Sequence, residues 1–229
     1  MCVLQAAGSQ AIAEYGHINR WMERMARTAG SHSQTTGPRV KAAALKLFSS
    51  RGYAAVSMRE IAREVGVQAG ALYRYTPNKQ SLLFSLMHDH MTDLLAEWSG
   101  YVCGPTPQDC LLGFVRCHLE YHLPRGDAVF IAYMELRNLS DDNFAQIEGL
   151  RKRYEDVLEA IVHAGVKAGV FAVADNKIAT LALIGLLKEV STWYRPDGRL
   201  EDADLVELYQ TMACRVVGIK VGKCSTGQV

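Results

Sequence analysis

The amino-acid sequence predicts an all-α protein of about nine helices. Apolar residues recur at positions i, i+3, i+4 and i+7 along most of the chain, the spacing of one helix face. Short runs rich in Gly, Pro, Asp and Asn separate these segments, and no stretch alternates as strands between hairpin turns would. We expect a flexible extension over residues 1–36, a three-helix domain over 37–83 and a larger helical domain over 84–229.

The first two helices of the small domain are delimited by clear signals. The first, at residues 38–50, has an apolar face made of Val40, Ala44, Leu47 and Phe48. The second follows Ser57, a favoured N-cap residue, with Glu60 three positions later as a capping box requires. Gly66 is expected to end it, because helices commonly end in a left-handed residue that glycine adopts at little cost.

The third helix is short and carries small residues. It is expected over residues 68–75, and Pro77 stops it. Ala69, Gly70 and Ala71 leave it a small exposed surface that can approach a ligand closely.

Two short helices joined by a glycine turn have the layout of a helix-turn-helix, whose second helix enters the DNA major groove. Gln68 can contact a base edge, and Arg74 and Lys79 can contact phosphates or guanine. Tyr73 and Tyr75 offer hydroxyls to phosphates and rings to thymine methyl groups.

The charge distribution favours the same function. Residues 1–80 hold 11 Lys and Arg against 4 Asp and Glu, a net of +7, whereas residues 81–229 hold 14 against 20, a net of −6. A basic N-terminal part and an acidic remainder are expected when one end of a protein faces phosphates.

The larger domain is expected to be a series of helices separated by turns. The breaks are 104–107, 124–127, 140–143, 169–175 and 195–198. The helices between them are expected at 81–98, 108–122, 128–139, 140–168, 176–194 and 201–220.

Composition narrows the protein class. Six Cys are scattered without a CxxC pair, which fits reduced thiols in the cytoplasm. No window of about 18 apolar residues is present, so no membrane association is expected.

No catalytic or cofactor motif stands out, and we expect neither enzymatic activity nor a cofactor or metal. His118 and His122 stand at i, i+4 as in a zinc-protease helix, but the glutamate between them, Glu120, is one position away from the pattern. Cys110 and Cys117 lie two helical turns apart and leave a redox switch open as an alternative.

The run from Arg39 to Leu83 resembles the DNA-binding domain of the TetR family of bacterial transcriptional regulators. The matching positions are Ala43, Ala44, Leu47, Phe48, Gly52, Tyr53, Ile61, Ala62, Gly66, Val67, Leu72, Tyr73 and Lys79. Thr76 and Lys41 depart from the pattern, at positions where the family usually has an aromatic and an apolar residue.

This resemblance implies roles for individual residues. Arg59 matches a position that can contact guanine, and residues 68–71 match the turn that faces the groove. The positions that match phosphate contacts are Ser57, Tyr73, Tyr75 and Lys79.

A homodimer is expected, because one short helix contacts too few base pairs for useful selectivity and two-fold pairing makes a palindromic operator the natural target. In the resembled family the last two helices of each chain build the dimer. The apolar stripes of the last two helices here are Ala179, Ala182, Leu183, Leu186 and Val190, and Leu205, Leu208, Tyr209, Met212, Val216 and Ile219.

A small effector is expected in the larger domain, in an apolar pocket with a few polar groups. The candidate residues are Met87, Met91, Phe114, Tyr121, Phe130, Tyr133, Met134, Arg137, Ile184 and Trp193. Residues 133–200 resemble TetR-type repressors of fatty-acid or sterol catabolism, a group that responds to acyl-CoA thioesters. The cations that could meet the CoA phosphates are Arg137, Arg151, Lys152, Arg153 and Arg195.

The sequence therefore predicts a cytoplasmic, homodimeric repressor that an apolar effector releases from DNA. A redox- or metal-responsive regulator of the same fold and a helical protein-interaction module are the alternatives. Residues 12–26 are either a basic arm for the DNA minor groove or part of a disordered tail.

Overall fold

The computed structural model describes residues 33–219, and every regular element in that range is helical. The chain falls into two compact units, divided between Leu82 and Leu83. The predicted all-α class is confirmed. The expectations for residues 12–26 and for the start of the 29–38 linker lie outside the described residues.

The first unit contains α2 (Ser33–Arg51), α3 (Met58–Val65) and α4 (Ala69–Leu72). The linker expected at residues 29–38 is wrong from Ser33 onward, because α2 already includes Gly37 and Pro38. Thr36 and Val40 are buried, so packing of this turn outweighs the poor helix propensity of its glycine and proline.

The third helix is shorter than the sequence pattern predicts. Beyond Leu72 the backbone continues as a tight turn, in which the N–H groups of Arg74 and Tyr75 donate to the carbonyls three residues earlier at 3.2 and 2.9 Å. This tighter pairing is typical of a helix end. The expected helix over residues 68–75 is therefore one α-helical turn followed by a non-helical turn.

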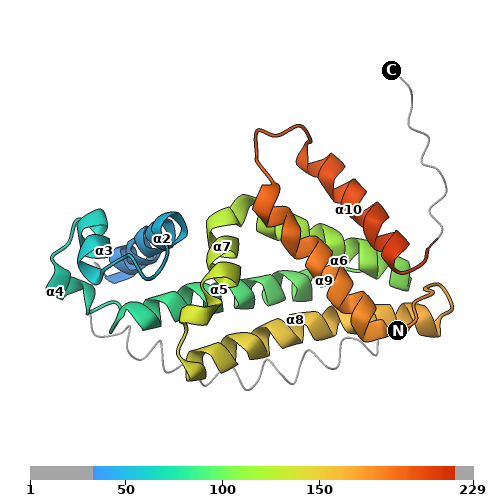
Figure 1. The fold of residues 1–229 in the computed structure, drawn as a ribbon, viewed down its shortest axis with the longest axis horizontal. Coiled ribbons are helices and arrows are strands. Elements are labelled where there is room, and N and C mark those ends of the chain that lie inside the picture. Colours follow the sequence, from blue (N-terminus) through green and yellow to red (C-terminus); the bar gives the residue numbers. More distant parts are fainter. Residues whose placement is uncertain (1–32, 220–229) are drawn as a thin grey trace. The chain divides into compact units, whose positions relative to one another are not determined.

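The second unit is a bundle of long helices (Figure 1). Its elements are α5 (Lys79–Gly100), α6 (Pro107–His122), the 3-10 helix η1 (Leu123–Arg125), α7 (Gly126–Met134), the 3-10 helix η2 (Leu136–Asn138), α8 (Asp141–Lys167), α9 (Asn176–Trp193) and α10 (Asp202–Val216).

Two expected helices end early. The one expected over residues 128–139 is α7 followed by η2, because Glu135 has φ −101° and ψ 5° and leaves the α-helical conformation. The last one, expected to reach residue 220, ends at Val216, and Gly218 follows with φ 78°.

Helix α6 is the centre of the second unit and packs against α8, α9 and α10. It begins with a capping box in which the Thr106 side chain accepts from the Asp109 N–H at 3.1 Å and Pro107 occupies the first turn. Nine of its residues are buried, including Phe114, His118 and His122. In the part of the chain described, no helix is long and apolar enough to cross a bilayer.

Candidate functional site

Helix α3 is fixed at both ends as the sequence predicts. The Ser57 hydroxyl accepts from the Glu60 N–H at 3.3 Å, and the Glu60 carboxylate accepts from the Ser57 N–H at 2.8 Å. These bonds hold the pKa of the Glu60 carboxyl below its usual value. Gly66 ends the helix with φ 78°, and Ile61, Ala62 and Val65 are buried beneath it. The Ser57 side chain, expected to contact phosphate, is thus engaged in holding α3.

Helix α4 presents an exposed surface over one buried anchor, Leu72. Gln68 precedes it with an exposed side chain that makes no hydrogen bond to the helix end. At Gly70, no atom lies within 4 Å of where a Cβ would be. Ala69 and Ala71 are half-buried, so the outer face of this turn consists of backbone, Gly70 and the Gln68 amide.

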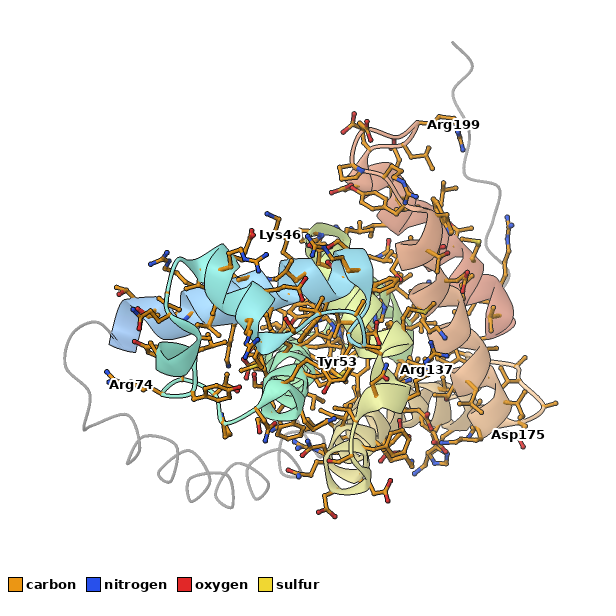
Figure 2. All side chains as sticks on the ribbon, turned by 60° about the vertical axis from the view of Figure 1, so that its left-hand side comes forward. Lys46, Tyr53, Arg74, Arg137, Asp175 and Arg199 are labelled. Carbon is orange, nitrogen blue, oxygen red and sulfur yellow. The ribbon has the colours of Figure 1, made fainter. Side chains whose placement is uncertain are left out.

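The residues after α4 add exposed polar groups to the same region. The Tyr73 side chain is 55% exposed, and Tyr75 is half-buried. Arg74 is exposed and its side chain extends away from the α4 ribbon (Figure 2). Thr76, a departure from the TetR pattern, is buried, and its hydroxyl donates to the Asn78 carbonyl at 3.1 Å, so it stabilises this turn.

Lys79 has a different role from the one the sequence suggested. Its ammonium donates to the carbonyl oxygens of Tyr53, Val56 and Ala54 at 2.9, 2.8 and 3.4 Å. An ammonium has three protons to donate, and three backbone carbonyls take them here. Lys79 therefore positions the turn between α2 and α3, and the expectation of a direct phosphate contact is corrected.

In the described part of the first unit, the cations outnumber the anions, and both anions are paired. Residues 33–82 hold 8 Lys and Arg against 2 Asp and Glu, a net of +6. Lys46, on α2 (Figure 2), pairs with Glu64 at 2.9 Å, and Arg51 pairs with Glu60 at 3.3 Å. Arg59 is exposed on α3, as a base-contacting role requires. This arrangement gives the unit the electrostatic character of a phosphate-binding surface.

The expected effector residues differ in burial. Met87, Met91, Phe114 and Tyr121 are buried, and Tyr133 and Ile184 are half-buried. Phe130, Met134, Trp193 and Arg137 are exposed. Helical spacing identified apolar positions correctly, but it does not tell a face that packs inward from one that faces outward.

Three histidines share the core with the buried members of that set. His90, His118 and His122 are 5%, 1% and 3% exposed. The His118 and His122 rings are stacked with centroids 4.0 Å apart, and the His90 ring lies 5.2 Å from that of His122. Burial lowers the pKa of His90 to about 3 and that of His122 to about 4, and lowers that of His118 as well.

From the sequence, His118 and His122 were considered only as possible metal ligands. Within residues 33–219, no group of three or more His, Cys, Asp or Glu side chains is arranged to hold a metal ion. The signal that could have placed His118 and His122 in the core is their apolar context on α6, where Val115 and Leu119 are also buried.

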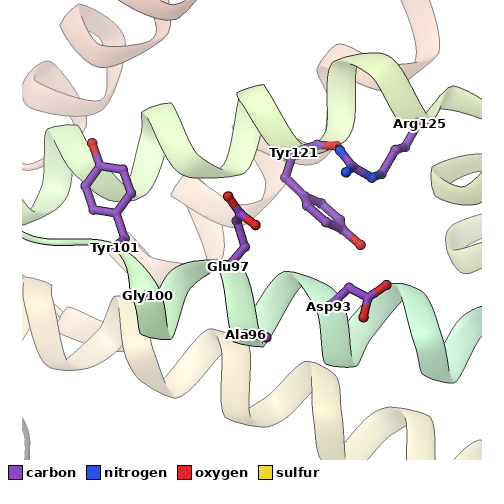
Figure 3. A pocket seen from close by; sticks show the side chains of 7 residues that line it. All are labelled: Asp93, Ala96, Glu97, Gly100, Tyr101, Tyr121 and Arg125. Atoms are coloured by element: carbon purple, nitrogen blue, oxygen red, sulfur yellow. The ribbon is translucent and has the colours of Figure 1, made fainter.

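A hollow of about 540 Å³ opens between α5 and α6 (Figure 3). Its lining residues are Asp93, Ala96, Glu97, Gly100, Tyr101, Tyr121 and Arg125. Arg125 reaches back along α6, where its guanidinium lies 4.2 Å from the Tyr121 ring centroid and donates to the Tyr121 carbonyl at 2.7 Å. Tyr121 is the one expected effector residue in this lining.

Cys103 and Cys117 are poorly suited to redox sensing. Burial raises the pKa of Cys117 to about 11 and that of Cys103 to about 12. Thiolates react and thiols do not, so a raised pKa opposes oxidation. A side-chain hydrogen bond with Cys110 also raises the pKa of Cys103, so Cys110 interacts with Cys103, whereas the sequence suggested Cys117 as its partner.

The last two helices, α9 and α10, each have a buried and an exposed face. Most of the α9 stripe expected at a dimer interface belongs to the core, since Ala179, Leu183 and Val190 are buried. The exposed face of α9 carries Ile178, Leu181, Ala182 and Gly185. On α10, Leu205 and Tyr209 are buried, Met212 is half-buried, and Leu208 and Val216 are 48% and 39% exposed. Ile219, expected in the same stripe, is half-buried and lies beyond the end of α10.

Each of the two units contains a region that matches a known protein family. Residues 41–86 match the family described as "Bacterial regulatory proteins, tetR family", and residues 104–217 match "Tetracyclin repressor-like, C-terminal domain".

Relatives match over most of the chain. The HTH-type transcriptional repressor KstR2 of Rhodococcus jostii (strain RHA1) is 27% identical over 158 residues, 68% of this chain and 78% of that protein. The fatty acid metabolism regulator protein of Bacillus subtilis (strain 168) is 25% identical over 169 residues, covering 72% and 86%. The structure of AibR in complex with isovaleryl coenzyme A and operator DNA superposes with a TM-score of 0.70 and 25% identity, covering 77% and 97%. The structure has a helix-turn-helix with an exposed second helix, followed by a helical second unit. With these matches, the chain belongs to the TetR family of bacterial transcriptional regulators.

Proposed function

We propose that this protein is a homodimeric repressor that binds a palindromic operator through α3 and α4, and that an apolar effector in residues 84–229 releases it. The observation that carries the proposal is the exposed, glycine-containing turn of α4 in a unit of net charge +6. Phosphate contacts by the cations would position the unit, and the Gln68 amide and Arg59 guanidinium would contact bases.

The exposed faces of α9 and α10 support the dimer. Ile178, Leu181, Ala182 and Gly185 stand at i, i+3, i+4 and i+7, so they form one apolar stripe on α9. At Gly185 no atom lies within 4 Å of where a Cβ would be, so a second helix can approach closely. A continuous apolar stripe on a helix surface is typical of an interface between subunits.

The effector class follows from the relatives and from two cations on the second unit. The AibR structure holds isovaleryl coenzyme A, and other relatives are named for fatty-acid metabolism or as KstR2 repressors. Arg151 and Lys188 each lie 5.2 Å from the Tyr133 ring centroid. Arg151 also pairs with Glu148 at 3.3 Å, and Arg137 is exposed. Cations of this kind are suited to CoA phosphates, so an acyl-CoA thioester is the effector we propose.

The proposed release mechanism is a shift between two conformations that differ in DNA affinity. An effector shifts such an equilibrium only by its difference in affinity for the two states. A coupling free energy of about 1–3 kcal/mol is typical of regulators of this kind.

Selection of duplex DNA from a random pool tests the function. The enriched sequences should be palindromic, bound by two copies of the chain, and bound with an affinity that falls steeply as salt rises. A dodecanoyl-CoA titration then tests release from the enriched site. Recovery of no preferred sequence would contradict operator binding, and recovery of an asymmetric site bound by one copy would contradict the dimer.

A further inference from the structure

Two buried histidine nitrogens in the second unit have no hydrogen-bond partner. They are Nδ1 of His90 on α5 and Nε2 of His122 on α6, in side chains that are 5% and 3% exposed. Buried polar atoms are nearly always hydrogen-bonded in native proteins, and an exception commonly marks a position that another molecule occupies.

The protonation of His122 is fixed by its neighbour. Its Nδ1 lies 2.7 Å from the carbonyl oxygen of His118, which can only accept, so Nδ1 carries the proton. Nε2 of the neutral ring is therefore an acceptor without a donor. Nε2 remains an unprotonated acceptor near neutral pH, because burial lowers the pKa of His122 to about 4.

The neighbouring tyrosine hydroxyls are hydrogen-bonded to other groups. The Tyr121 hydroxyl donates to the His90 carbonyl at 3.0 Å, and the Tyr154 hydroxyl lies 3.1 Å from His118 Nδ1. The remaining donor for His122 Nε2 must come from outside this group of side chains.

The surroundings suit a largely apolar molecule. Met87 and Met91 are buried on α5 beside His90 in sequence, and methionine side chains adapt their shape to a ligand. The Tyr121 ring lies 5.4 Å from the His90 ring and 5.3 Å from the His122 ring, and the same tyrosine lines the hollow between α5 and α6 (Figure 3). Tyr121 therefore packs against both histidine rings and also lines the hollow.

We infer that His122 Nε2 and His90 Nδ1 form the polar end of the effector site and bind an O–H group carried on an apolar chain. The hydroxyl donates to His122 Nε2, and its oxygen accepts from His90 when the Nδ1 of that ring carries the proton. This inference rests on the proposed effector function of the second unit and adds the class of ligand, an apolar molecule with a buried hydroxyl. A plain alkyl chain would leave both nitrogens unpaired.

A pair of probes with equal numbers of heavy atoms tests the inference without CoA. The full chain, labelled with ¹⁵N-histidine, is titrated with 1-octanol, which can donate, and with heptyl methyl ether, which cannot. Octanol should shift the His122 Nε2 resonance toward that of a hydrogen-bonded acceptor, and the ether should leave it in place. Equal spectra with both probes, as when an ordered water already fills the site, would overturn the inference.

Variants and a CoA pair separate this result from the proposed function. His122→Leu should abolish the preference for octanol, His122→Gln should retain part of it through the amide oxygen, and Tyr154→Phe should leave it unchanged. Calorimetry with 3-hydroxydodecanoyl-CoA and dodecanoyl-CoA should show at least tenfold tighter binding of the hydroxylated compound. Failure of both CoA compounds together with a positive octanol result would refute the acyl-CoA proposal alone, whereas equal affinity for the two would refute the histidine site.

Discussion

The Lys79 ammonium lies 4.2 Å from the centroid of the Tyr53 ring and donates to the Tyr53 carbonyl oxygen at 2.9 Å. These residues are 26 positions apart, and the contact ties the first residue of α5 to the turn that leads from α2 into α3. The same ammonium also holds the Val56 carbonyl, immediately before the Ser57 cap. The orientation of α3 therefore depends on a cation that the sequence alone suggested for DNA.

Lys79→Met should destabilise the first unit. Methionine retains the apolar stem but removes the donor of the Val56 carbonyl, at a cost of about 1–3 kcal/mol, whereas the Tyr53 carbonyl keeps the Val56 N–H at 3.3 Å. Affinity should fall similarly for all DNA sequences, because the change alters the position of the domain and no base contact. Urea denaturation and binding to two unrelated duplexes measure both effects. Lys46→Met is the control, because the exposed Lys46–Glu64 pair should contribute less than about 1 kcal/mol.

Gly66→Ala and Gly70→Ala should separate folding from DNA binding. Gly66 has φ 78°, so alanine there should reduce the free energy of unfolding by about 1–2 kcal/mol. Gly70 lies within α4 with open space around its missing side chain, so alanine should leave stability unchanged or raise it by up to about 1 kcal/mol. The added methyl group should instead lower operator affinity by about tenfold, or 1.4 kcal/mol, by preventing close approach. Tight operator binding by Gly70→Ala would show that this turn does not face DNA.

The buried histidines should make the protein less stable in mild acid. Burial lowers the pKa of His90 to about 3 and that of His122 to about 4, so between these values and about 6.5 the unfolded chain binds more protons. Stability is therefore fully present above pH 6.5 and is lost as the pH falls below it, by about 2 kcal/mol per histidine between pH 7 and 5. Urea denaturation at pH 7 and pH 5 measures this loss. His122→Gln should make this loss smaller by about 2 kcal/mol. An unchanged loss would show that His122 does not cause the pH dependence.

Leu181→Glu should dissociate the proposed dimer without unfolding the chain. Leu181 is 44% exposed, so a carboxylate there is solvated in the monomer but would be buried against a second copy. The dimer dissociation constant should rise on the order of 100-fold, and operator affinity should fall with it. Sedimentation equilibrium measures the dimer dissociation constant. Val102→Glu is a matched control, since Val102 is 89% exposed and lies between α5 and α6. An unchanged dimer in Leu181→Glu would exclude this face of α9.

Local features of the fold could be predicted from the sequence, and features that depend on tertiary packing could not. The Ser57–Glu60 capping box and the Gly66 helix end involve residues within one turn of each other, and both are confirmed. The carbonyl groups that accept from Lys79 are distant in sequence, so the sequence alone predicted a phosphate contact for its side chain. On α9 the helical period was correct, but the stripe chosen packs mostly inward and the outward face is centred near Leu181. Hydrophobic periodicity predicts which residues share one face of a helix, but it does not predict whether that face packs against the core or faces outward.

Base preference at each position of the selected operator tests the central claim most directly. Each base pair is substituted in turn, and affinity is measured for the wild-type chain and for Gln68→Ala. If α4 of each subunit faces the major groove, Gln68→Ala should lose about 1–3 kcal/mol of discrimination at two symmetry-related positions and keep it elsewhere. Tyr73→Phe, a change at an expected phosphate contact, should weaken binding to every sequence alike. Full discrimination retained by Gln68→Ala at every position would contradict the assignment of this helix as the one that contacts the bases.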